Sequence, residues 1–179
     1  FEGNHGVCIE NIEESLEEPT DKRLLVIAEA LHQGYSIEKI HELTRIDCWF
    51  LQRLRHISVT AKQLRDCGNI NRLEYELLLK AKRQGFSDFQ IARELGMEES
   101  INIDKAMLLV RSKRKLMGIF PYVKQIDTLA AEYPAQTNYL YVTYNAVAHD
   151  IKYEMDRRSV VVLGSGAYRI GSSVEFDWC

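Results

Sequence analysis

Apolar residues recur at three- and four-residue spacing through much of the chain, which is the pattern of helices with one buried face. A first helix is predicted over 20–33, and Gly34 supplies its stop. Ser36 is placed to cap a short second helix. Asp47 is placed to cap a third and longer one, which should end near Gly68.

A second set of helices repeats features of the first. Apolar residues continue at helical spacing from about Asn71 to Gly85, and a further helix is predicted at about 100–116. Around the two glycine stops, matching residues stand at a constant offset of 51 positions, although a trailing leucine slips by one. The glycine allows the left-handed turn that ends one helix, the aromatic residue after it packs back on that helix, and the serine caps the next helix. We therefore predict two related helical units, with a capping box formed by Ser87 and Gln90. The matching residues are Gly34, Tyr35, Ser36, Ile40 and Leu43 in the first unit and Gly85, Phe86, Ser87, Ile91 and Leu95 in the second.

The pattern changes after Pro121. A short alanine-rich helix followed by an extended segment is predicted within 126–137, with Asp127 as its cap. The β-branched and aromatic run 139–144 predicts a strand, and 149–153 is either its partner or a surface loop.

Near the end, the apolar run 160–163 predicts a strand buried on both faces. A glycine-rich turn with Gly164 and Gly166 follows, and Gly171 lies near an expected helix start. Strand, turn and helix start are the opening of a Rossmann-like unit, yet the sequence stops before a second parallel strand. We therefore expect the chain to be a fragment of a longer protein.

The predicted fold is mainly α, and the chain divides into four segments. These are an acidic linker at 1–19, a helical domain at 20–120, a connecting segment at 121–157, and the incomplete start of an α/β domain at 158–179. Six glutamates are the only Asp, Glu, Lys or Arg residues before Pro19, so the remaining residues carry +3 against a total of −3. We interpret the leader as a solvated connector, and the remainder is too weakly basic for a typical nucleic-acid binder.

Composition narrows the class of protein further. With 46% hydrophobic and 27% charged residues, the chain resembles an ordinary globular protein. No apolar run approaches the roughly 20 residues needed to span a bilayer, so no membrane association is expected. The four cysteines form no CxxC pair and have no histidine at ligand spacing, which indicates neither zinc nor a disulfide framework. Reduced cysteines favour a cytoplasmic location, with mitochondria as the alternative.

Three blocks of residues resemble the carbamoyl phosphate synthetase family, in its large, synthetase part. The likeness covers roughly residues 20–179 and follows the family's order: a helical oligomerisation domain, a connection, then the pre-ATP-grasp start of the second synthetase half. The residues of the third block are similar to those of the eukaryotic, multifunctional form that serves pyrimidine biosynthesis. The blocks are Leu43-Thr44 with Ile46-Asp47 and Trp49-Phe50-Leu51, then Val123 to Thr128 through Ala130-Ala131-Glu132 to Thr137–Tyr141 and Thr143-Tyr144, and Val162–Gly166 with Arg169–Cys179.

The resemblance implies an ATP-dependent ligase that makes carbamoyl phosphate from bicarbonate, ammonia drawn from glutamine, and two ATP, with Mg or Mn and K as ions of the parent. The ATP-grasp domains lie outside this segment, so neither a cofactor, a metal site nor a catalytic residue is expected within it. By carry-over from the family, Glu175 lines the internal carbamate path, and Arg169 is a weaker candidate for the same path. The implied partners are further copies of the parent and its remaining synthetase and glutaminase domains.

Three features have competing interpretations. Gly164, Gly166 and Gly171 resemble a dinucleotide fingerprint, but the last glycine comes too late, so a tight structural turn is favoured. Glu175 could equally pair with Arg169 or cap its own helix. Residues 87–96 have the spacing of a helix-turn-helix, with the helix from Ser100 as recognition helix, so a nucleic-acid-binding module is the alternative function. Apolar residues on that helix's first turns argue against base contacts.

The predicted helices also carry more apolar residues than one buried stripe requires. Runs such as 24–27 and 77–79 place apolar groups on two faces, and an exposed apolar face usually marks a protein contact. We take Leu25 and Leu79 as interface candidates for self-association. Trp49 and Phe50 are predicted to be core or interface anchors.

Overall fold

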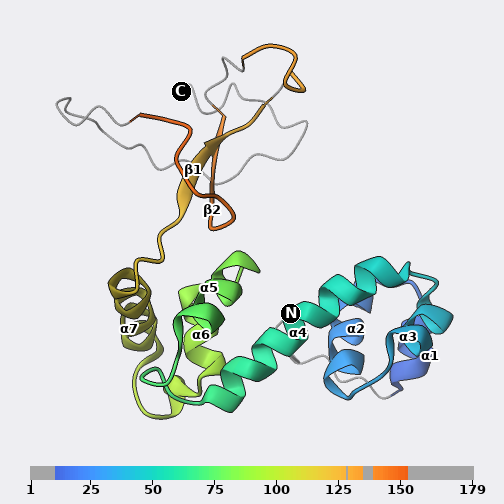
Figure 1. Ribbon diagram of the computed structural model, residues 1–179. Helices are drawn as coiled ribbons and strands as arrows, with labels where there is room; N and C mark the ends of the chain where they lie inside the picture. Colours follow the sequence, from blue (N-terminus) through green and yellow to red (C-terminus); the bar gives the residue numbers. More distant parts are fainter. Residues whose placement is uncertain (1–10, 128, 135–138, 153–179) are drawn as a thin grey trace, which may run out of the picture.

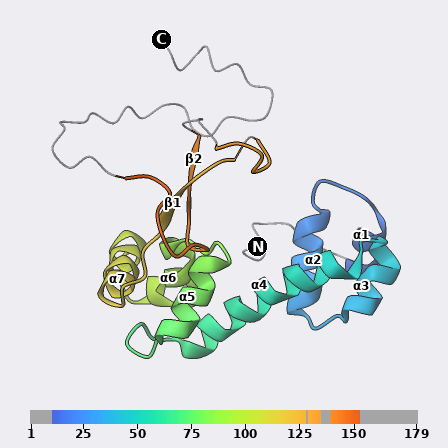
Figure 2. The same ribbon diagram turned by 45° about the horizontal axis from the view of Figure 1, so that its top comes forward.

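The computed structural model describes residues 11–127, 129–134 and 139–152, and it is mainly helical (Figure 1). Two groups of helices lie at opposite ends of one long helix, and a small hairpin stands beyond the second group (Figures 1 and 2). The first group contains α1 (Ile12–Glu17), α2 (Arg23–His32) and α3 (Ile37–Thr44), and the long helix is α4 (Cys48–Cys67). The second group contains α5 (Tyr75–Arg83), α6 (Asp88–Glu94), a 3-10 turn (Met97–Glu99) and α7 (Ile103–Leu116), and the hairpin pairs β1 (Tyr122–Gln125) with β2 (Leu140–Thr143).

Each group of helices has its own hydrophobic core, and α4 contributes to both. Leu51 is buried in the first core, whereas Ala61 and Leu64 are buried in the second. Leu51 and Leu64 are 13 positions apart, which at about 100° per residue places them about 140° apart around the helix axis. The long helix therefore buries different faces at its two ends. The first core comprises Leu16, Val26, Ile27, Ala30, Ile37, Ile40 and Leu51. The second comprises Ala61, Leu64, Leu73, Leu78, Ala81, Phe86, Ile91, Ala92, Leu95, Ala106, Val110 and Ile119.

The predicted repeat is present in the turns that end α2 and α5. Gly34 and Gly85 have positive φ values of 88° and 94°, a conformation that side chains with a Cβ rarely adopt. The aromatic residue after each glycine donates its backbone N–H to a carbonyl five residues back, at 3.0 Å in both units. The two units are thus related in backbone geometry as well as in sequence.

The repeat keeps its register further along the chain than the sequence indicated. Arg45 and Gly96, again 51 positions apart, both adopt left-handed backbone conformations at the ends of α3 and α6. The residues before them, Thr44 and Leu95, are both buried. Leu95 therefore corresponds to Thr44, and the one-residue slip against Leu43 disappears.

The predicted serine caps are also confirmed. Ser36 Oγ accepts from the backbone of Lys39 at 3.1 Å, and Ser87 Oγ accepts from Gln90 at 3.0 Å. In the second unit Gln90 Oε1 accepts in turn from the backbone N–H of Ser87 at 2.8 Å, which completes the capping box. Asp47 caps α4 by accepting from the backbone of Trp49 at 2.8 Å.

Removing either serine cap should weaken the fold by about 1 kcal/mol, because one backbone donor loses its acceptor. Ser87→Ala should cost more than Ser36→Ala, since the Gln90 side chain also loses its reciprocal arrangement. Urea unfolding of both variants measures the difference. Ser112→Ala is the matched control, because Ser112 is exposed within α7 and only bonds back to the carbonyl of Leu108. Equal losses for Ser112→Ala and Ser87→Ala would contradict the cap.

One prediction for the segment after Pro121 needs correction. In the described part of 126–137 no helix forms, although both carboxylate oxygens of Asp127 accept backbone N–H groups as a helix cap would, from Leu129 at 2.9 Å and from Ala131 at 2.6 Å. Ala130 and Ala131 have positive φ values, which ends any helical path. Residues 140–143 form a strand, as predicted; its partner is β1, so of the two alternatives for 149–153 the loop is the one observed in the described residues.

The described residues 149–152 are a loop that covers the other edge of β1. His149 Nδ1 accepts from the backbone N–H of Val123 at 3.0 Å, and the backbone N–H of Asp150 donates to the carbonyl of Val123 at 3.0 Å. The Asp150 carboxylate accepts from the backbone of Gln125 at 3.0 Å and binds Lys124. These hydrogen bonds and the salt bridge with Lys124 lower the pKa of Asp150.

The acidic leader also differs from its prediction. Residues Ile12–Glu17 form α1, and Leu16 is fully buried in the first core. The guanidinium of Arg23 donates to the carbonyl of Leu16 from Nε at 2.9 Å and from Nη2 at 2.6 Å. The prediction of a solvated connector is therefore wrong for this stretch, because Leu16 and the partly buried Ile12 pack against the first core. The predicted α/β start at 158–179 lies outside the described residues.

Candidate assembly surface and linker joint

Two aromatic side chains stand exposed at the start of α4. Trp49 and Phe50 are 57% and 58% exposed, and their rings meet edge to face with centroids 5.0 Å apart. Arg53, one turn further on, lies 4.7 Å from the centre of the Trp49 ring. Tryptophan and arginine are the residues that most often dominate binding energy at protein interfaces. We name Trp49, Phe50 and Arg53 the aromatic patch.

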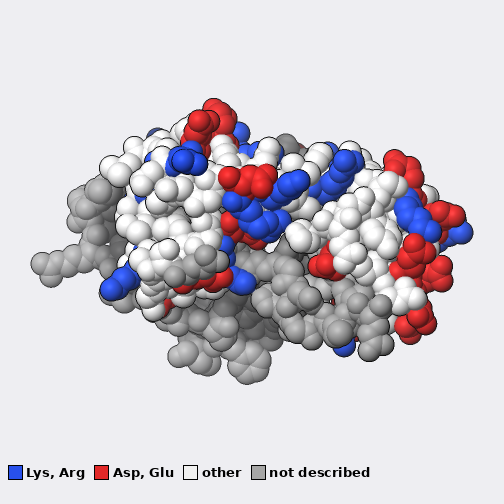
Figure 3. Space-filling model, turned by 90° about the horizontal axis from the view of Figure 1, so that it is seen from below, with Lys and Arg blue, Asp and Glu red and all other residues white. Residues whose placement is uncertain are grey.

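A second exposed apolar group lies on α7. Leu109 and Leu116 are seven residues apart and so fall on nearly the same side of the helix, with Leu108 beside them. All three are exposed, and Leu116 reaches 87%. In the face drawn in Figure 3, a broad area without charged side chains lies on the side of the second helical group. Charged side chains of both signs run along the middle and at the end occupied by α1 and α3.

The interface candidates predicted from the sequence occupy different environments. Leu25 is partly exposed on α2, while its neighbour Leu24 is 50% exposed. Leu79 is partly buried and packs against the second core. Leu25 therefore remains available at the surface, whereas a charge at position 79 would also disturb the interior.

Three charged side chains meet in the interior of the second helical group. Lys82 Nζ donates to Asp88 Oδ1 at 2.8 Å, and Arg114 Nε donates to Asp88 Oδ2 at 2.9 Å. The side chains are only 7%, 13% and 11% exposed for Lys82, Asp88 and Arg114. Lys82 also donates to the carbonyl of Phe86 at 2.7 Å. We call Lys82, Asp88 and Arg114 the ion cluster; it ties α5, α6 and α7 together.

The pKa of Asp88 is lowered by this arrangement. Burial alone would raise the pKa of the Asp88 carboxyl, but the hydrogen bonds and charges of Lys82 and Arg114 outweigh burial. The carboxylate is therefore ionised at neutral pH, as two neighbouring cations require.

The ion cluster also receives the end of the hairpin. Lys82 Nζ and Arg114 Cζ lie 5.0 and 5.8 Å from the centre of the Tyr144 ring, which packs against the second core. Burial raises the pKa of the Tyr144 hydroxyl. Asn145 Nδ2 donates to the backbone carbonyl of Arg83 at 3.0 Å. We call the contacts of Tyr144 and Asn145 with the helices the linker joint, because they fasten the segment after β2 to the second helical group (Figure 2).

The sequence patterns predicted neither the ion cluster nor the linker joint. In the sequence, Arg114 is one of several basic residues in the last turn of a helix, where positive charge is favoured by the helix dipole. Asp88 is an acidic residue in the first turn of a helix, where negative charge is favoured for the same reason. One signal was available: Lys82 falls four positions after Leu78, on the apolar side of α5, and a buried lysine needs a counter-ion. The identity of that counter-ion depends on how α6 and α7 pack, which no local pattern gives.

The remaining predicted site residues lie outside the described part of the chain. These are Glu175 and Arg169 of the expected carbamate path and Gly164, Gly166 and Gly171 of the glycine-rich turn. Among the described residues, no group of three or more His, Cys, Asp or Glu side chains is placed to hold a metal ion. No helix within the described residues is long and apolar enough to cross a membrane.

Two families of known proteins match most of the chain. Residues 2–114 match the family described as "Carbamoyl-phosphate synthetase large chain, oligomerisation domain". Residues 156–179 match "Carbamoyl phosphate synthase preATP-grasp domain". The two matches follow each other in the order that the sequence resemblance implied. They support the resemblance to carbamoyl phosphate synthetases and not the alternative of a nucleic-acid-binding module.

Similar proteins include an arginine-specific large chain and two multifunctional proteins. Over 180 residues the chain is 49% identical to the mitochondrial carbamoyl phosphate synthase arginine-specific large chain of Neurospora crassa. This alignment covers 100% of this chain and 15% of that protein. Over 167 residues it is 50% identical to Multifunctional protein pyr1-3 of Dictyostelium discoideum and to Multifunctional protein CAD of Squalus acanthias. Each of those alignments covers 93% of this chain and 7% of the relative. The chain therefore spans a small part of the length of these relatives.

Proposed function

The chain belongs to the carbamoyl phosphate synthetase large-chain family, and on that premise we propose that it assembles the parent enzyme and links its two synthetase halves. The observation that carries the proposal is the match of the helical region to the family's oligomerisation domain. The aromatic patch supports it, since solvent-exposed tryptophan and phenylalanine beside an arginine are typical of an interface centre.

For the parent we propose an ATP-dependent ligase that forms carbamoyl phosphate from bicarbonate, glutamine-derived ammonia and two ATP. ATP, Mg or Mn, and K would bind in other domains, and this segment alone would not be catalytically competent. Glu175 and Arg169 are proposed to line the carbamate path. The proposed partners are further copies of the parent and its synthetase and glutaminase domains.

We further propose the multifunctional, pyrimidine-pathway form in the cytoplasm. The support is the serine-containing block around Gly164 and Gly171, which resembles the eukaryotic multifunctional enzymes. The mitochondrial, arginine-specific form is the alternative, because a relative of that name is about as similar to this chain. Cys48 and Cys67 are free thiols, which suits the reducing interior of either compartment.

We also propose that the parent self-associates through the aromatic patch. Changing Trp49 and Phe50 together to glutamate in the parent should dissociate the assembly, because each charge would have to be desolvated at the contact. Sedimentation velocity measures the mass of the assembly, and circular dichroism measures helix content. Gln52→Glu is the matched control, because Gln52 is an exposed polar residue on the same turn of α4.

The same assay tests the interface predicted from the sequence. Leu25→Glu should weaken self-association if α2 belongs to the contact, whereas Leu79→Glu is less suitable because Leu79 touches the second core. A Trp49 and Phe50 double variant that keeps both its helix content and its assembly mass would exclude the aromatic patch as the interface.

A further inference from the structure

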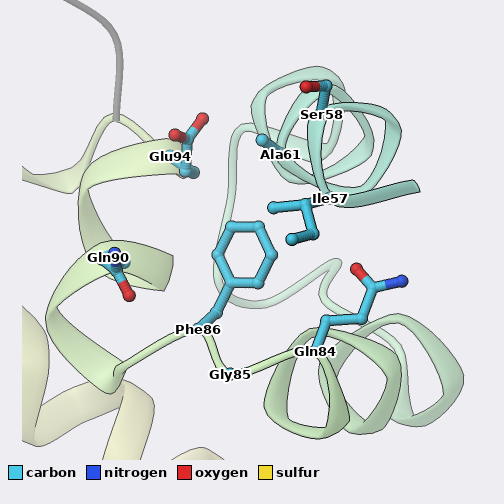
Figure 4. A pocket seen from close by; sticks show the side chains of 8 residues that line it. All are labelled: Ile57, Ser58, Ala61, Gln84, Gly85, Phe86, Gln90 and Glu94. Atoms are coloured by element: carbon cyan, nitrogen blue, oxygen red, sulfur yellow. The ribbon is translucent and has the colours of Figure 1, made fainter. Parts of the chain in front are cut away.

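A small cavity lies where the turn between α5 and α6 faces α4. Its volume is about 190 Å³, and its lining combines an apolar floor with a polar rim. Figure 4 shows the Phe86 ring at its centre, with Ile57 and Ala61 of α4 opposite. A cavity of about 150 Å³ is sufficient to hold benzene, so this one fits a molecule of a single ring. The rim is formed by Ser58, Gln84, Gln90 and Glu94.

The polar rim contains an acceptor that the protein leaves without a donor. Gln84 Oε1 is the one buried side-chain polar atom of the described residues that has no hydrogen-bond partner. Such an atom costs free energy unless a ligand or water supplies the donor. Figure 4 shows this oxygen on the side of Ile57, and because the atom is buried, the Gln84 side chain has to turn for a ligand in the cavity to reach it.

Gln90 offers the complementary group on the opposite side of the Phe86 ring (Figure 4). Its Oε1 atom is engaged by the capping box, so its Nε2 hydrogens are the donors that this side chain can offer a ligand. An acceptor and a donor on either side of an aromatic ring suit a flat molecule that itself carries one donor and one acceptor. A cyclic amide carries one of each in the plane of its ring, side by side on one edge, so its N–H can meet Gln84 Oε1, the group left without a partner, while its C=O does not reach Gln90 at the same time.

The related unit provides an internal comparison. At the repeat-equivalent position, 51 residues earlier, Gln33 is exposed and its amide donates to Glu29 at 3.0 Å. The equivalent of Glu29 in the second unit is Lys80, which instead binds Gln63 at 2.9 Å. The two units therefore share a turn, but only Gln84 is left with a buried oxygen without a partner beside a cavity.

We propose that the cavity at Phe86 is a binding site for a small planar molecule with an amide N–H, which stacks on Phe86 and donates to Gln84 Oε1. The site is separate from the aromatic patch and does not depend on self-association. A ligand here would bridge α4 to the α5–α6 turn, and so would stiffen the attachment of the second helical group.

The probe for this proposal is 2-pyridone, a one-ring cyclic amide, titrated into the ¹⁵N-labelled 179-residue chain. Amide chemical shifts should change saturably at Gly85, Phe86 and Ile57, with a dissociation constant in about the millimolar range for so small a molecule. N-methyl-2-pyridone, which lacks the N–H, should bind about five- to tenfold more weakly, as expected for one neutral hydrogen bond.

Gln84→Leu removes the acceptor and keeps the shape of the side chain. This variant should bind 2-pyridone about five- to tenfold more weakly than the wild type, and it should no longer distinguish the two probes. Gln33→Leu, at the equivalent position of the first unit, is the matched control and should bind like the wild type. The proposal is overturned if 2-pyridone produces no saturable shifts at these residues, or if Gln84→Leu still prefers 2-pyridone over its N-methyl derivative.

Discussion

Replacing Asp88 with alanine should destabilise the second helical group by about 3–5 kcal/mol, because the change leaves Lys82 and Arg114 buried without their counter-ion. Urea unfolding at neutral pH, followed by circular dichroism, measures this loss. Asp66→Ala is the control, since Asp66 is exposed on α4 and its removal should change stability little. Replacing Lys82, Asp88 and Arg114 together with Met, Leu and Met should cost less than Asp88→Ala, because no uncompensated charge remains.

Acidification should reduce the difference between the wild type and Asp88→Ala. The pKa of Asp88 in the folded protein lies below its ordinary value of 3.8. The stabilisation is therefore complete above that value and is lost as the pH falls through the lower, folded-state pKa. An unfolding free-energy difference that stayed constant to well below pH 3.8 would show that the Asp88 charge does not hold the cluster together.

Truncating Leu51 or Leu64 to alanine should each cost about 2–5 kcal/mol, because each leucine is fully buried. The losses should appear in different parts of the chain. Leu51 lies in the first core, so hydrogen exchange should accelerate mainly in α1, α2 and α3 of the Leu51→Ala variant. Leu64→Ala should instead accelerate exchange in α5, α6 and α7.

Val59→Ala is the control for both truncations, because Val59 lies on the same helix between them and is exposed. It should change stability by less than about 0.5 kcal/mol. Equal acceleration of exchange in both helical groups by either truncation would show that the two cores unfold as one unit.

Local chemistry explains which helices the sequence could predict. The caps at Ser36, Asp47 and Ser87 depend on side chains within three residues of the groups they bind, and all three are confirmed. Helical periodicity also predicted the long helix ending at Gly68 and the two related units. These features need no knowledge of distant residues.

The errors arose where local signals competed or where distant contacts decided. Glutamates around Ile12 and Leu16 hid the two apolar residues that pack α1 against the first core, and alanines after Asp127 suggested a helix that the positive φ values of Ala130 and Ala131 exclude. The ion cluster joins residues of three helices, so it depends on tertiary packing that no window of sequence contains. The same holds for the cavity at Phe86, whose lining comes from α4, the turn after α5, and α6.

The change of buried face along α4 makes this helix a fixed angular spacer. One residue inserted between Leu54 and Ile57 would rotate the second helical group by about 100° and shift it by about 1.5 Å relative to the first. An insertion of seven residues would nearly restore the angle while adding about 10 Å of length. The number of residues between Leu51 and Leu64 thus sets the relative orientation of the two groups, independently of the side chains that lie between them. Length variation in this helix is therefore tolerable only in steps close to two turns.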